Sequence, residues 1–576
     1  MATQPTGAMT RDQSVRMLTA AGAPFELVEQ EVRGVPMRVY AKAPASMREV
    51  YTTSLAFDDR DFLVYDDTRW TYREFGERVA RLAHHLVENL GVTTGDRVAI
   101  GMRNYPEWVV SFWAVQTIGA IGVPLNAWWT GPELEFALRD STPTVALLDD
   151  ERVERLGPGL ADLVEHTLVV RARRSMPAFV RSLHGVIEHD VERTLPEVEL
   201  DPDQASTIMY TSGTTGRPKG AVQTHRSHCT NLTNTAFAGA VAAAMAPAPA
   251  AADEPAAHTV SLQTFPFFHI GGLSGLYVST AFGATLVLMY KWDPAEAVGL
   301  VVREQVNSVA GVPTVVRQLF DEFDRQGVVA ESLGSISSGG APVPPSLIDR
   351  IGERSGQAIR PANGYGLTET TSAVVMNSGP EYYAHPDSVG RPVPVADITI
   401  RDEFGVEVDD GVTGELWVRG PNVVDGYWNA PEATADAFTD GWFRTGDAAY
   451  VRDGLVYVVD RVKDVVLRGG ENVYCAEVEA ALHEFAEVAD VAVIGLPHDV
   501  LGEEVAAVVE FMPGHTPPSG AEMRRRLADR LAAFKIPSRI FVTTGSVPRN
   551  ATGKAMKKDL RSALVTGDPA YRDVDS

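Results

Sequence analysis

Apolar residues recur at helical spacing in TYREFGERVARLAHHLVENLG, residues 71–91. Thr71 and Glu74 have the spacing of a capping box at the start of this segment, and Gly91 is typical of a helix end. The apolar positions stand four, three and four residues apart, which is the period of one buried helical face. The pattern predicts an amphipathic helix.

Short apolar runs alternate with such helical stretches through the first part of the chain. A continuous apolar run bounded by turn residues is typical of a strand buried on both faces, and a helix between two such strands favours parallel pairing. The sequence therefore predicts layered α/β structure with parallel sheet. The expected strands are residues 97–102, 121–126, 144–150 and 167–172, and a further helix is expected over 106–119.

The pattern changes near Gly411, where short alternating strands are separated by glycines. This change predicts a small β-rich subdomain. A compact mixed segment follows Lys463, with helices expected over 476–485 and 520–537 and strands over 488–497, 503–512 and 539–544. We expect an α/β protein with a large N-terminal domain of layered subdomains, residues 1–462, and a small mobile α+β C-terminal domain, residues 463–576.

Composition narrows the function classes. The chain has 576 residues, 45% of them hydrophobic, and a formal net charge of −25, which argues against binding nucleic acid or anionic lipid. Cys229 and Cys475 stand in no metal-ligand pattern and are expected to be free thiols. The polar N-terminus has no secretory signal, and residues 240–255 are expected to be a flexible, alanine-rich surface insertion. These features predict a cytoplasmic protein without a membrane-spanning segment.

The stretch YTSGTTGRPKG, residues 210–220, combines glycines, hydroxyl side chains and one lysine after a strand-like run. Glycines let backbone N–H groups approach phosphate oxygens, hydroxyls donate hydrogen bonds, and lysine adds a positive charge. A flexible surface turn is the alternative. The residues expected to cradle a polyphosphate are Thr211, Ser212, Gly213, Thr214, Thr215, Gly216 and Lys219.

This loop resembles the signature loop of the adenylate-forming superfamily, which includes acyl-CoA synthetases, peptide-synthetase adenylation domains and beetle luciferases. Six further motifs follow in the family's order: SGGAP, GYGLTE, GELWVRG, GWFRTGD, DRVKDVVLRGGENVYCAEVE and PRNATGKAMKK. The resemblance implies that a carboxylate attacks the α-phosphate of ATP, with Mg²⁺, to form an acyl-adenylate. A thiol, that of coenzyme A, then displaces AMP to form a thioester.

The resemblance also implies roles for residues of the N-terminal domain. Glu369 is the expected Mg²⁺ ligand, Thr368 donates to the α-phosphate, and Asp447 and Arg461 bind the ribose. Without the resemblance, GYGLTET would be a turn with a helix-capping pair, and Asp447 a turn aspartate. The segments expected beside the adenine and the acyl group contain Gly339, Gly340, Ala341, Tyr365 (stacked on adenine) and Gly366.

The C-terminal motifs are expected to serve both half-reactions. Lys554 matches the lysine that reaches the carboxylate and the α-phosphate during adenylation. Lys463 matches the hinge about which the C-terminal domain rotates. Arg468, Gly469 and Gly470 match the segment that lines the pantetheine tunnel, and Lys535 is expected near the phosphates of CoA.

The acid itself is suggested by a few positions. His269, with Gly271, is expected to line the acyl pocket together with Gly340 and Gly366. The acetate-specific branch has tryptophan where this chain has Gly366, so we expect an open pocket floor and an apolar acid larger than acetate: medium- or long-chain fatty, aromatic or terpenoid/steroid-derived. Trp128 and Trp129 are expected to pack in a core or an interface.

The expected partners are a small carboxylic acid, a second copy of the chain in a homodimer, and a protein acetyltransferase or deacetylase acting on Lys554. Three alternatives remain open from the sequence. They are an enzyme that loads a carrier protein instead of CoA, a non-catalytic binding protein with a degenerate site, and a luciferase-like oxygenase, because a fold does not fix a function.

Overall fold

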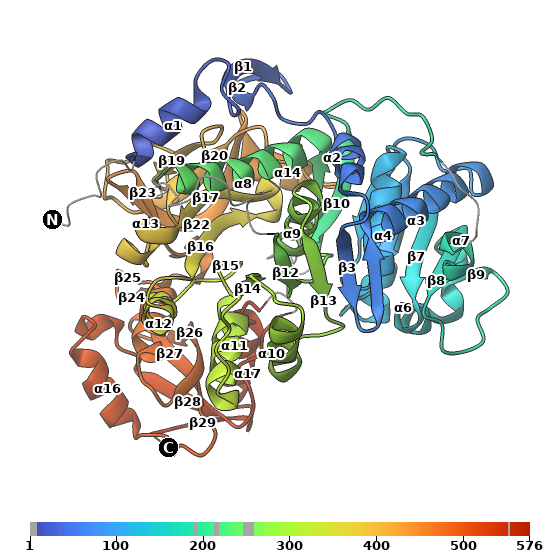
Figure 1. Ribbon diagram of the computed structural model, residues 1–576. Helices are drawn as coiled ribbons and strands as arrows, with labels where there is room; N and C mark the ends of the chain where they lie inside the picture. Colours follow the sequence, from blue (N-terminus) through green and yellow to red (C-terminus); the bar gives the residue numbers. More distant parts are fainter. Residues whose placement is uncertain (1–8, 189–193, 212–217, 246–257, 551–552, 576) are drawn as a thin grey trace.

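A computed structural model describes residues 9–188, 194–211, 218–245, 258–550 and 553–575. These residues form a mixed α/β structure with a large N-terminal part and a small C-terminal part (Figure 1). The predicted fold class is confirmed.

The first large sheet has seven strands in the order β11-β10-β6-β5-β7-β8-β9. Its strands β5 to β8 pair in parallel, as predicted. β10 and β11, which flank the glycine-rich stretch in the sequence, instead pair antiparallel. The strands are β5 Arg97–Gly101, β6 Ile121–Pro124, β7 Val145–Asp149, β8 His166–Val170, β9 Val180–Ser182, β10 Ala205–Thr211 and β11 Lys219–Thr224.

The second large sheet has nine strands in the order β18-β17-β16-β15-β14-β12-β13-β3-β4. Strands β3, β12, β13, β14, β15 and β16 pair in parallel, and antiparallel strands complete both edges. Its members are β3 Asp61–Tyr65, β4 Thr68–Thr71, β12 Val260–Gln263, β13 Thr285–Leu288, β14 Ser308–Gly311, β15 Ser335–Gly339, β16 Arg360–Leu367, β17 Ser372–Ser378 and β18 Arg391–Pro392.

Helices fill the space between the two sheets and cover their outer faces. One core joins residues of both sheets through α2 Met47–Ser54, α3 Tyr72–His84, α4 Pro106–Thr117 and α9 Ile270–Ala281. The capping box of Thr71 and Glu74 begins α3 as predicted. α4 has no polar face because both sheets enclose it, and Trp108 and Trp113 are completely buried. The outer faces are covered by α5 Gly131–Ser141 and α6 Asp150–Leu156 on one sheet, and by α10 Pro294–Arg303, α11 Pro313–Gln326 and α12 Pro345–Ser355 on the other.

The predicted β-rich subdomain is a five-stranded antiparallel sheet that begins before Gly411. Its strands are β19 Asp397–Arg401, β20 Gly414–Arg419, β21 Phe438–Thr439, β22 Trp442–Arg452 and β23 Leu455–Arg461, and α14 Pro431–Ala437 precedes β21.

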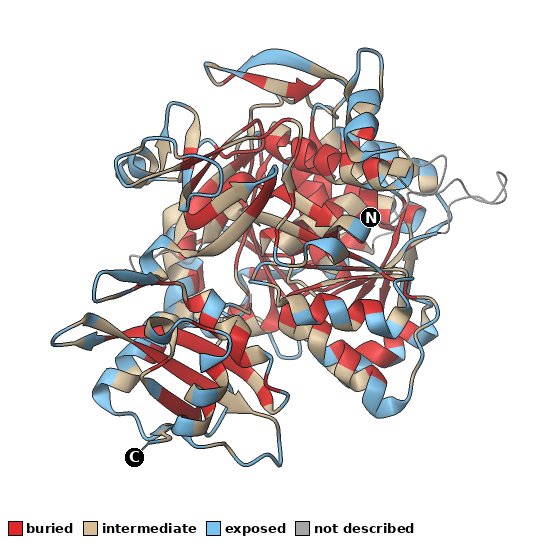
Figure 2. Ribbon diagram, turned by 90° about the vertical axis from the view of Figure 1, so that its left-hand side faces the viewer, coloured by how far each residue is buried: buried red, intermediate tan, exposed pale blue. Residues whose placement is uncertain are grey.

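The C-terminal part has its own sheet and its own buried core (Figure 2). The helix expected over 520–537 ends earlier, at Ala528, and Leu531 is buried in the same core after the chain has turned. Its elements are β24 Val466–Arg468, β25 Glu471–Val473, α15 Cys475–His483, β26 Val488–His498, β27 Gly502–Phe511, α16 Gly520–Ala528, β28 Arg539–Thr543, α17 Lys557–Thr566 and β29 Tyr571–Asp573.

The insertion expected over 240–255 is partly wrong. Helix α8 runs from His225 to Met245, so the alanines before Ala246 continue a helix, as their high helix propensity allows. The remainder of that segment lies outside the described residues. Across the described ranges, no helix combines the length and the apolar character needed to cross a membrane. The remaining elements are α1 Arg11–Thr19, the hairpin β1 Leu27–Val32 and β2 Val35–Tyr40, α7 His184–Ile187 and α13 Gly379–Ala384.

Candidate active site

Asp447 lies on β22 and is held from two sides. The Tyr365 hydroxyl donates to its Oδ2 at 2.5 Å, and Arg461 Nε lies 2.6 Å from its Oδ1. Arg461 stands opposite Asp447 in the register of β22 and β23, so the sheet itself brings these two side chains together. The carboxylate is buried. A buried carboxylate with fixed neighbours suits a ligand that offers hydroxyl groups, such as a ribose.

Glu369 lies in a tight turn, Thr368–Thr370, between β16 and β17. It is buried, and its Oε1 accepts a hydrogen bond of 2.8 Å from the Tyr427 hydroxyl. Thr371 and Ser372, which follow the turn, both have positive φ angles of 47° and 78°. This conformation is strained for residues with a side chain, so the surrounding contacts hold the turn in place.

The glycine-rich loop joins β10 to β11. Thr211 and Lys219 face each other where the two strands pair, so they form the base of the loop. The Lys219 Nζ lies 5.2 Å from the centroid of the Tyr427 ring, which is the distance of a cation–π contact. The predicted phosphate-binding residues Ser212, Gly213, Thr214, Thr215 and Gly216 lie outside the described residues.

Gly339 ends β15, and Gly340 and Ala341 follow it. Gly340 has a φ of 77°, and a side chain there would meet Phe265 and Val312, each at 3.7 Å. The ring of Phe265 stacks on His269, with 6.1 Å between ring centroids. The positive φ of Gly340 is a backbone conformation that glycine adopts readily.

His269 caps the first turn of α9, because its Nδ1 accepts a hydrogen bond from the Gly271 N–H at 3.1 Å. Burial lowers the pKa of His269 to about 3, and the positive charge of Lys554 acts in the same direction. The ring is therefore neutral at physiological pH. The effect of the Lys554 charge places this ring near the C-terminal lysine.

Gly366, which was expected to leave the pocket floor open, has another role. A Cβ on Gly366 would stand 1.9 Å from the Ser372 carbonyl oxygen. The glycine allows these two backbone segments to approach closely. The missing side chain at Gly366 does not open a cavity in its Cβ direction, which corrects the reason for expecting an open pocket floor there.

Lys554 approaches these residues from the C-terminal domain. Lys554 is exposed. Loss of water and the charge of Arg461 lower the pKa of Lys554, whereas Asp447 and Glu369 act to raise it. Gly553, which precedes the lysine, lies against the N-terminal domain, since a Cβ there would meet Val312 at 3.0 Å.

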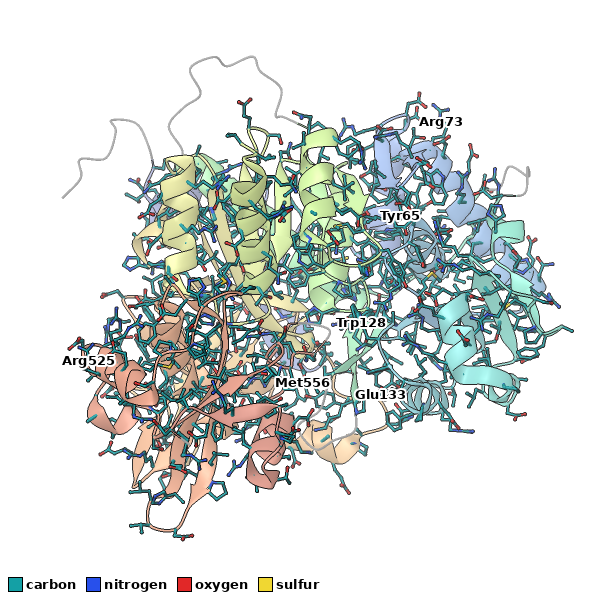
Figure 3. The ribbon with its side chains drawn as sticks, turned by 90° about the horizontal axis from the view of Figure 1, so that it is seen from below. Tyr65, Arg73, Trp128, Glu133, Arg525 and Met556 are labelled. Atoms are coloured by element: carbon teal, nitrogen blue, oxygen red, sulfur yellow. The ribbon has the colours of Figure 1, made fainter. Side chains whose placement is uncertain are left out.

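The loop of Lys554 is held by its own domain. Asn550 Oδ1 accepts from the Lys554 N–H at 3.0 Å, and the Arg549 guanidinium donates to the Gly553 carbonyl at 2.6 Å. Arg549 also forms a two-bonded ion pair with Asp490 of β26, with both distances at 2.6 Å. The side of this domain that bears Met556 faces the N-terminal part, and Arg525 lies on the opposite side (Figure 3).

Among the other C-terminal candidates, Lys463 lies near this cluster, since its charge helps to lower the pKa of Lys554. Lys463 is exposed in the turn Val462–Asp464, between β23 and β24. Arg468 donates to the Phe534 carbonyl, and Gly469 and Gly470 form the exposed tip of the β24–β25 hairpin with positive φ angles of 62° and 90°. Lys535 forms an ion pair with Glu477 at 2.7 Å. These contacts all lie within the C-terminal domain.

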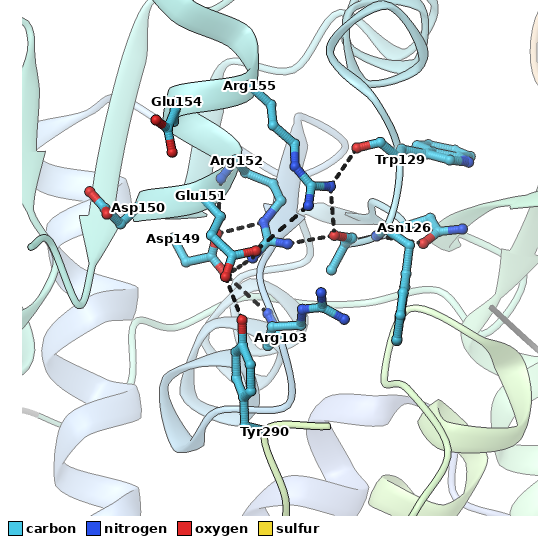
Figure 4. Close-up of polar contacts among 12 residues, drawn as sticks. Arg103, Asn126, Trp129, Asp149, Asp150, Glu151, Arg152, Glu154, Arg155 and Tyr290 are labelled. Atoms are coloured by element: carbon cyan, nitrogen blue, oxygen red, sulfur yellow. Dashed lines mark hydrogen bonds and ion pairs between the residues drawn. The ribbon is translucent and has the colours of Figure 1, made fainter. Parts of the chain in front are cut away.

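Trp128 is not a core residue, which corrects one part of the tryptophan prediction. It is 49% exposed and covers the Arg103 guanidinium at 4.1 Å, whereas Trp129 packs partly buried against a core. The fully buried Arg152 binds Asp149 and, together with Arg155, donates to backbone carbonyls of the loop 126–129 (Figure 4). The two arginines therefore hold the backbone of this loop in place.

The sequence reasoning missed three residues that hold the site. Tyr427 contacts Glu369, while Gln223 and Asn422 donate to carbonyls of the turn that carries it. Gln223 lies on β11, and Asn422 and Tyr427 lie in the connection after β20, where no local sequence pattern indicates a functional role. The one signal for Tyr427 in the sequence is its position shortly after the GELWVRG motif.

Buried carboxylates of the N-terminal part and the lysine of the C-terminal part are the groups expected of an adenylate-forming enzyme. Comparison with known proteins agrees. Residues 52–428 match the AMP-binding enzyme family, and residues 477–554 match the AMP-binding enzyme C-terminal domain. The chain therefore belongs to the AMP-binding enzyme family, in its branch of AMP-forming acid–thiol ligases.

Relatives with assigned activities cover nearly the whole chain. A feruloyl-CoA synthase of Amycolatopsis is 35% identical, and the match covers 86% of this chain and 94% of the synthase. A long-chain-fatty-acid–CoA ligase of Mycobacterium tuberculosis is 32% identical, and the match covers 86% of this chain and 93% of the ligase. The structure of an o-succinylbenzoate-CoA synthetase of Bacillus subtilis with its acyl-adenylate is 29% identical, covers 89% of this chain and 97% of its own, and has a TM-score of 0.74.

Proposed function

We propose that this protein is an ATP- and Mg²⁺-dependent carboxylic acid–CoA ligase whose substrate is an apolar acid larger than acetate, such as an aromatic or a medium- or long-chain fatty acid. The single observation that carries the proposal is that Lys554 lies near enough to Asp447 and Glu369 for their charges to raise its pKa, and near enough to His269 to lower the pKa of that ring. The lysine belongs to the C-terminal domain, and the carboxylates of Asp447 and Glu369 belong to the N-terminal domain. The related CoA ligases of aromatic and fatty acids support the substrate class.

The first half-reaction brings a carboxylate to the α-phosphate of ATP, so two anions must be neutralised and aligned. Lys554 supplies the positive charge at the attacked phosphorus, and Lys219 supplies another at the base of the phosphate loop. Asp447 accepts from the ribose hydroxyls with Arg461 beside it, while Thr368 donates to the α-phosphate. The carboxylate oxygen bonds to phosphorus, and pyrophosphate leaves.

The donor set at Glu369 fits magnesium. A carboxylate oxygen is a hard ligand, and Oε2 of Glu369 remains available while Oε1 is engaged by Tyr427. No group of three or more acidic, histidine or cysteine side chains that could hold a metal ion occurs in the part of the chain that the structure describes. That agrees with Mg²⁺, which proteins usually hold through one or two carboxylates and the phosphates of the substrate. Bound there, the ion neutralises phosphate charge.

The apolar character of the groups around His269 supports an apolar acid. The neutral His269 ring stacks on Phe265, and Val312 stands next to Gly340. These groups offer little to a second carboxylate or a charged tail. Sulfur attack in the second half-reaction then releases AMP as the sulfur–carbon bond forms. The exposed hairpin of Arg468, Gly469 and Gly470 would line the thiol's path after the C-terminal domain, residues 463–576, turns about Lys463.

A panel of acids tests the proposed function. Acetate, hexanoate, palmitate, benzoate and a hydroxycinnamate are compared for acid-dependent ATP–pyrophosphate exchange, and for AMP release with CoA or with a phosphopantetheinyl carrier protein. We expect the larger apolar acids to exceed acetate and free CoA to serve as acceptor. Exchange with no acid would favour a degenerate site, and turnover with the carrier alone would favour carrier loading.

Lys554 is also a proposed acetylation site for a protein acetyltransferase and deacetylase. The amine lies on a loop at the domain surface, and acetylation would remove its charge. Stoichiometric acetylation at Lys554 should therefore silence adenylation, and full activity of the acetylated protein would contradict the proposal. A homodimer remains our expectation for the assembly, and light scattering of the full chain tests it.

A further inference from the structure

The turn that carries Glu369 is held by three hydrogen bonds to three successive carbonyl oxygens. The side chain of Gln223 donates to the Thr368 carbonyl at 2.9 Å, and the Val424 N–H donates to that of Glu369 at 2.9 Å. The side chain of Asn422 donates to the Thr370 carbonyl at 2.8 Å. The backbone of the turn is therefore fixed, and the rotation of the Glu369 side chain is the freedom that remains.

Tyr427 restricts that remaining freedom. Its hydroxyl donates to Oε1 of Glu369 at 2.8 Å, and the carboxylate is buried. The Tyr427 ring is anchored independently of its hydroxyl. It packs edge-on against Phe438 with 5.7 Å between centroids, and the Tyr427 backbone N–H donates to the hydroxyl of Thr434 at 2.9 Å.

The segment that contains these donors also binds the phosphate-loop strand. The Trp428 N–H donates to the Gly220 carbonyl at 2.7 Å. The Val222 N–H donates to the Gly426 carbonyl at 3.0 Å, and the Asp425 N–H donates to the Val222 carbonyl at 3.2 Å. Residues 422–428, which we call the bridging segment, thus touch both the strand after the phosphate loop and the turn of Glu369. A displacement of either one would move the other.

We propose that Tyr427 is a positioning residue for the metal–nucleotide complex: its hydroxyl engages Oε1 of Glu369, so that Oε2 alone is presented to Mg²⁺. Magnesium demands near-octahedral geometry with short bonds, and a carboxylate held in one orientation meets that demand with less loss of freedom. This inference rests on the proposed function, since it assigns the metal to Glu369. It adds the residue that decides which oxygen binds.

Tyr427→Phe tests the proposal because it removes the hydroxyl and keeps the ring in its contacts. Tyr457→Phe is the matched control, since Tyr457 lies on β23 of the same β-rich sheet and its ring stacks on Tyr450 at 4.8 Å. The Mg²⁺ concentration for half-maximal ATP–pyrophosphate exchange should rise about tenfold or more in Tyr427→Phe. The rate at saturating Mg²⁺ should change far less, and the control should behave as the unchanged protein.

A binding measurement separates this proposal from the proposed function. Mn²⁺ is titrated with a non-hydrolysable ATP analogue and followed by electron paramagnetic resonance. Tyr427→Phe should raise the dissociation constant of Mn²⁺ by the same factor of about ten or more. If this rise is seen although no tested acid is turned over, the proposed function fails and the positioning role stands. Normal exchange with unaltered Mg²⁺ and Mn²⁺ dependence in Tyr427→Phe would overturn the positioning role alone.

A double variant shows whether Tyr427 acts through Glu369. Residues that act as one unit give non-additive losses. Glu369→Gln should weaken Mn²⁺ binding by itself, and adding Tyr427→Phe should cause little further loss. Two losses that simply multiply would mean that Tyr427 acts elsewhere and would contradict the proposal. Thermal unfolding without nucleotide should give similar midpoints for Tyr427→Phe and Tyr457→Phe.

Discussion

The two sides of the site are built differently. On the N-terminal side, Asp447 and Glu369 are buried, and each carboxylate has a tyrosine hydroxyl bonded to one oxygen. On the C-terminal side, Lys554 keeps exposed surface, and its loop is held through Arg549 and Asn550 of its own domain. The two carboxylates are thus fixed by neighbouring hydroxyls of the N-terminal part, whereas the loop of Lys554 depends on contacts within the C-terminal part.

One contact crosses the hinge. Asp460, on the N-terminal side of Lys463, accepts hydrogen bonds from the N–H groups of Cys475 and Ala476 at the start of α15. Burial raises the pKa of Asp460, while the charge of Lys557 opposes that rise. A bond between a carboxylate and a helix N-terminus is favourable. It must break if the C-terminal domain turns about Lys463.

The largest expected effect comes from removing the movable cation. Lys554→Ala should lower acid-dependent adenylation by about 3 to 4 kcal/mol of transition-state stabilisation, roughly a hundred- to a thousandfold. The fixed side remains intact, so CoA transfer from supplied acyl-AMP should be largely retained. Assaying both half-reactions separately checks this, and an equal loss in both would contradict the division between the two sides.

Fixing the hinge should spare adenylation and impair thioester formation, which is the reverse of the effect of Lys554→Ala. Lys463→Pro locks one backbone angle in the turn between the domains, so adenylation should survive. Thioester formation should fall by about a hundredfold, the scale expected when reacting groups are misplaced. Single-turnover measurements of acyl-AMP and acyl-CoA follow the two steps. Unimpaired overall turnover would count against rotation at this residue.

Weakening the contact across the hinge should give a smaller effect. Asp460→Ala removes the acceptor at the start of α15, and loss of such a cap costs about 1 kcal/mol, or roughly fivefold. Because the contact holds Lys554 at the site, adenylation should fall by this factor while CoA transfer is unchanged. A drop in thioester formation instead would show that the contact favours the other orientation.

The smallest effect concerns pH. A lysine serves as a cation only while protonated, and the lowered pKa of Lys554 means that it loses its proton at a lower pH than an ordinary lysine. Adenylation should therefore decline on the alkaline side below the usual lysine value of about 10.4. Lys554→Arg keeps its charge and should move that decline to higher pH. Identical alkaline limits for both proteins would assign the decline to another group.

Particular elements show how far sequence reasoning reached. The capping box and apolar spacing placed α3 correctly, because local hydrogen bonds and one buried face are encoded in neighbouring residues. The helix predicted over 520–537 was too long, since Leu531 is buried by a turn of the chain that local periodicity does not reveal. Trp128 was expected to pack in a core or an interface, and it lies over Arg103 at the surface and not in a core.

The same contrast holds at the site. The motifs indicated Asp447, Glu369, His269 and Lys554 as site residues, and the structure brings Lys554 near the other three. Their assigned roles remain predictions. The explanation for Gly366 had to change, because only the folded backbone shows the Ser372 carbonyl in the Cβ direction.

The sequence by itself determined the α/β class, the family and the chemical groups available to the site, because these depend on residue type, spacing and order along the chain. Only the tertiary structure decided which oxygen of Glu369 stays available, that Tyr427, Gln223 and Asn422 hold its turn, and that Lys554 reaches the site from another domain. Those contacts join residues far apart in the chain, and long-range packing alone sets their distances.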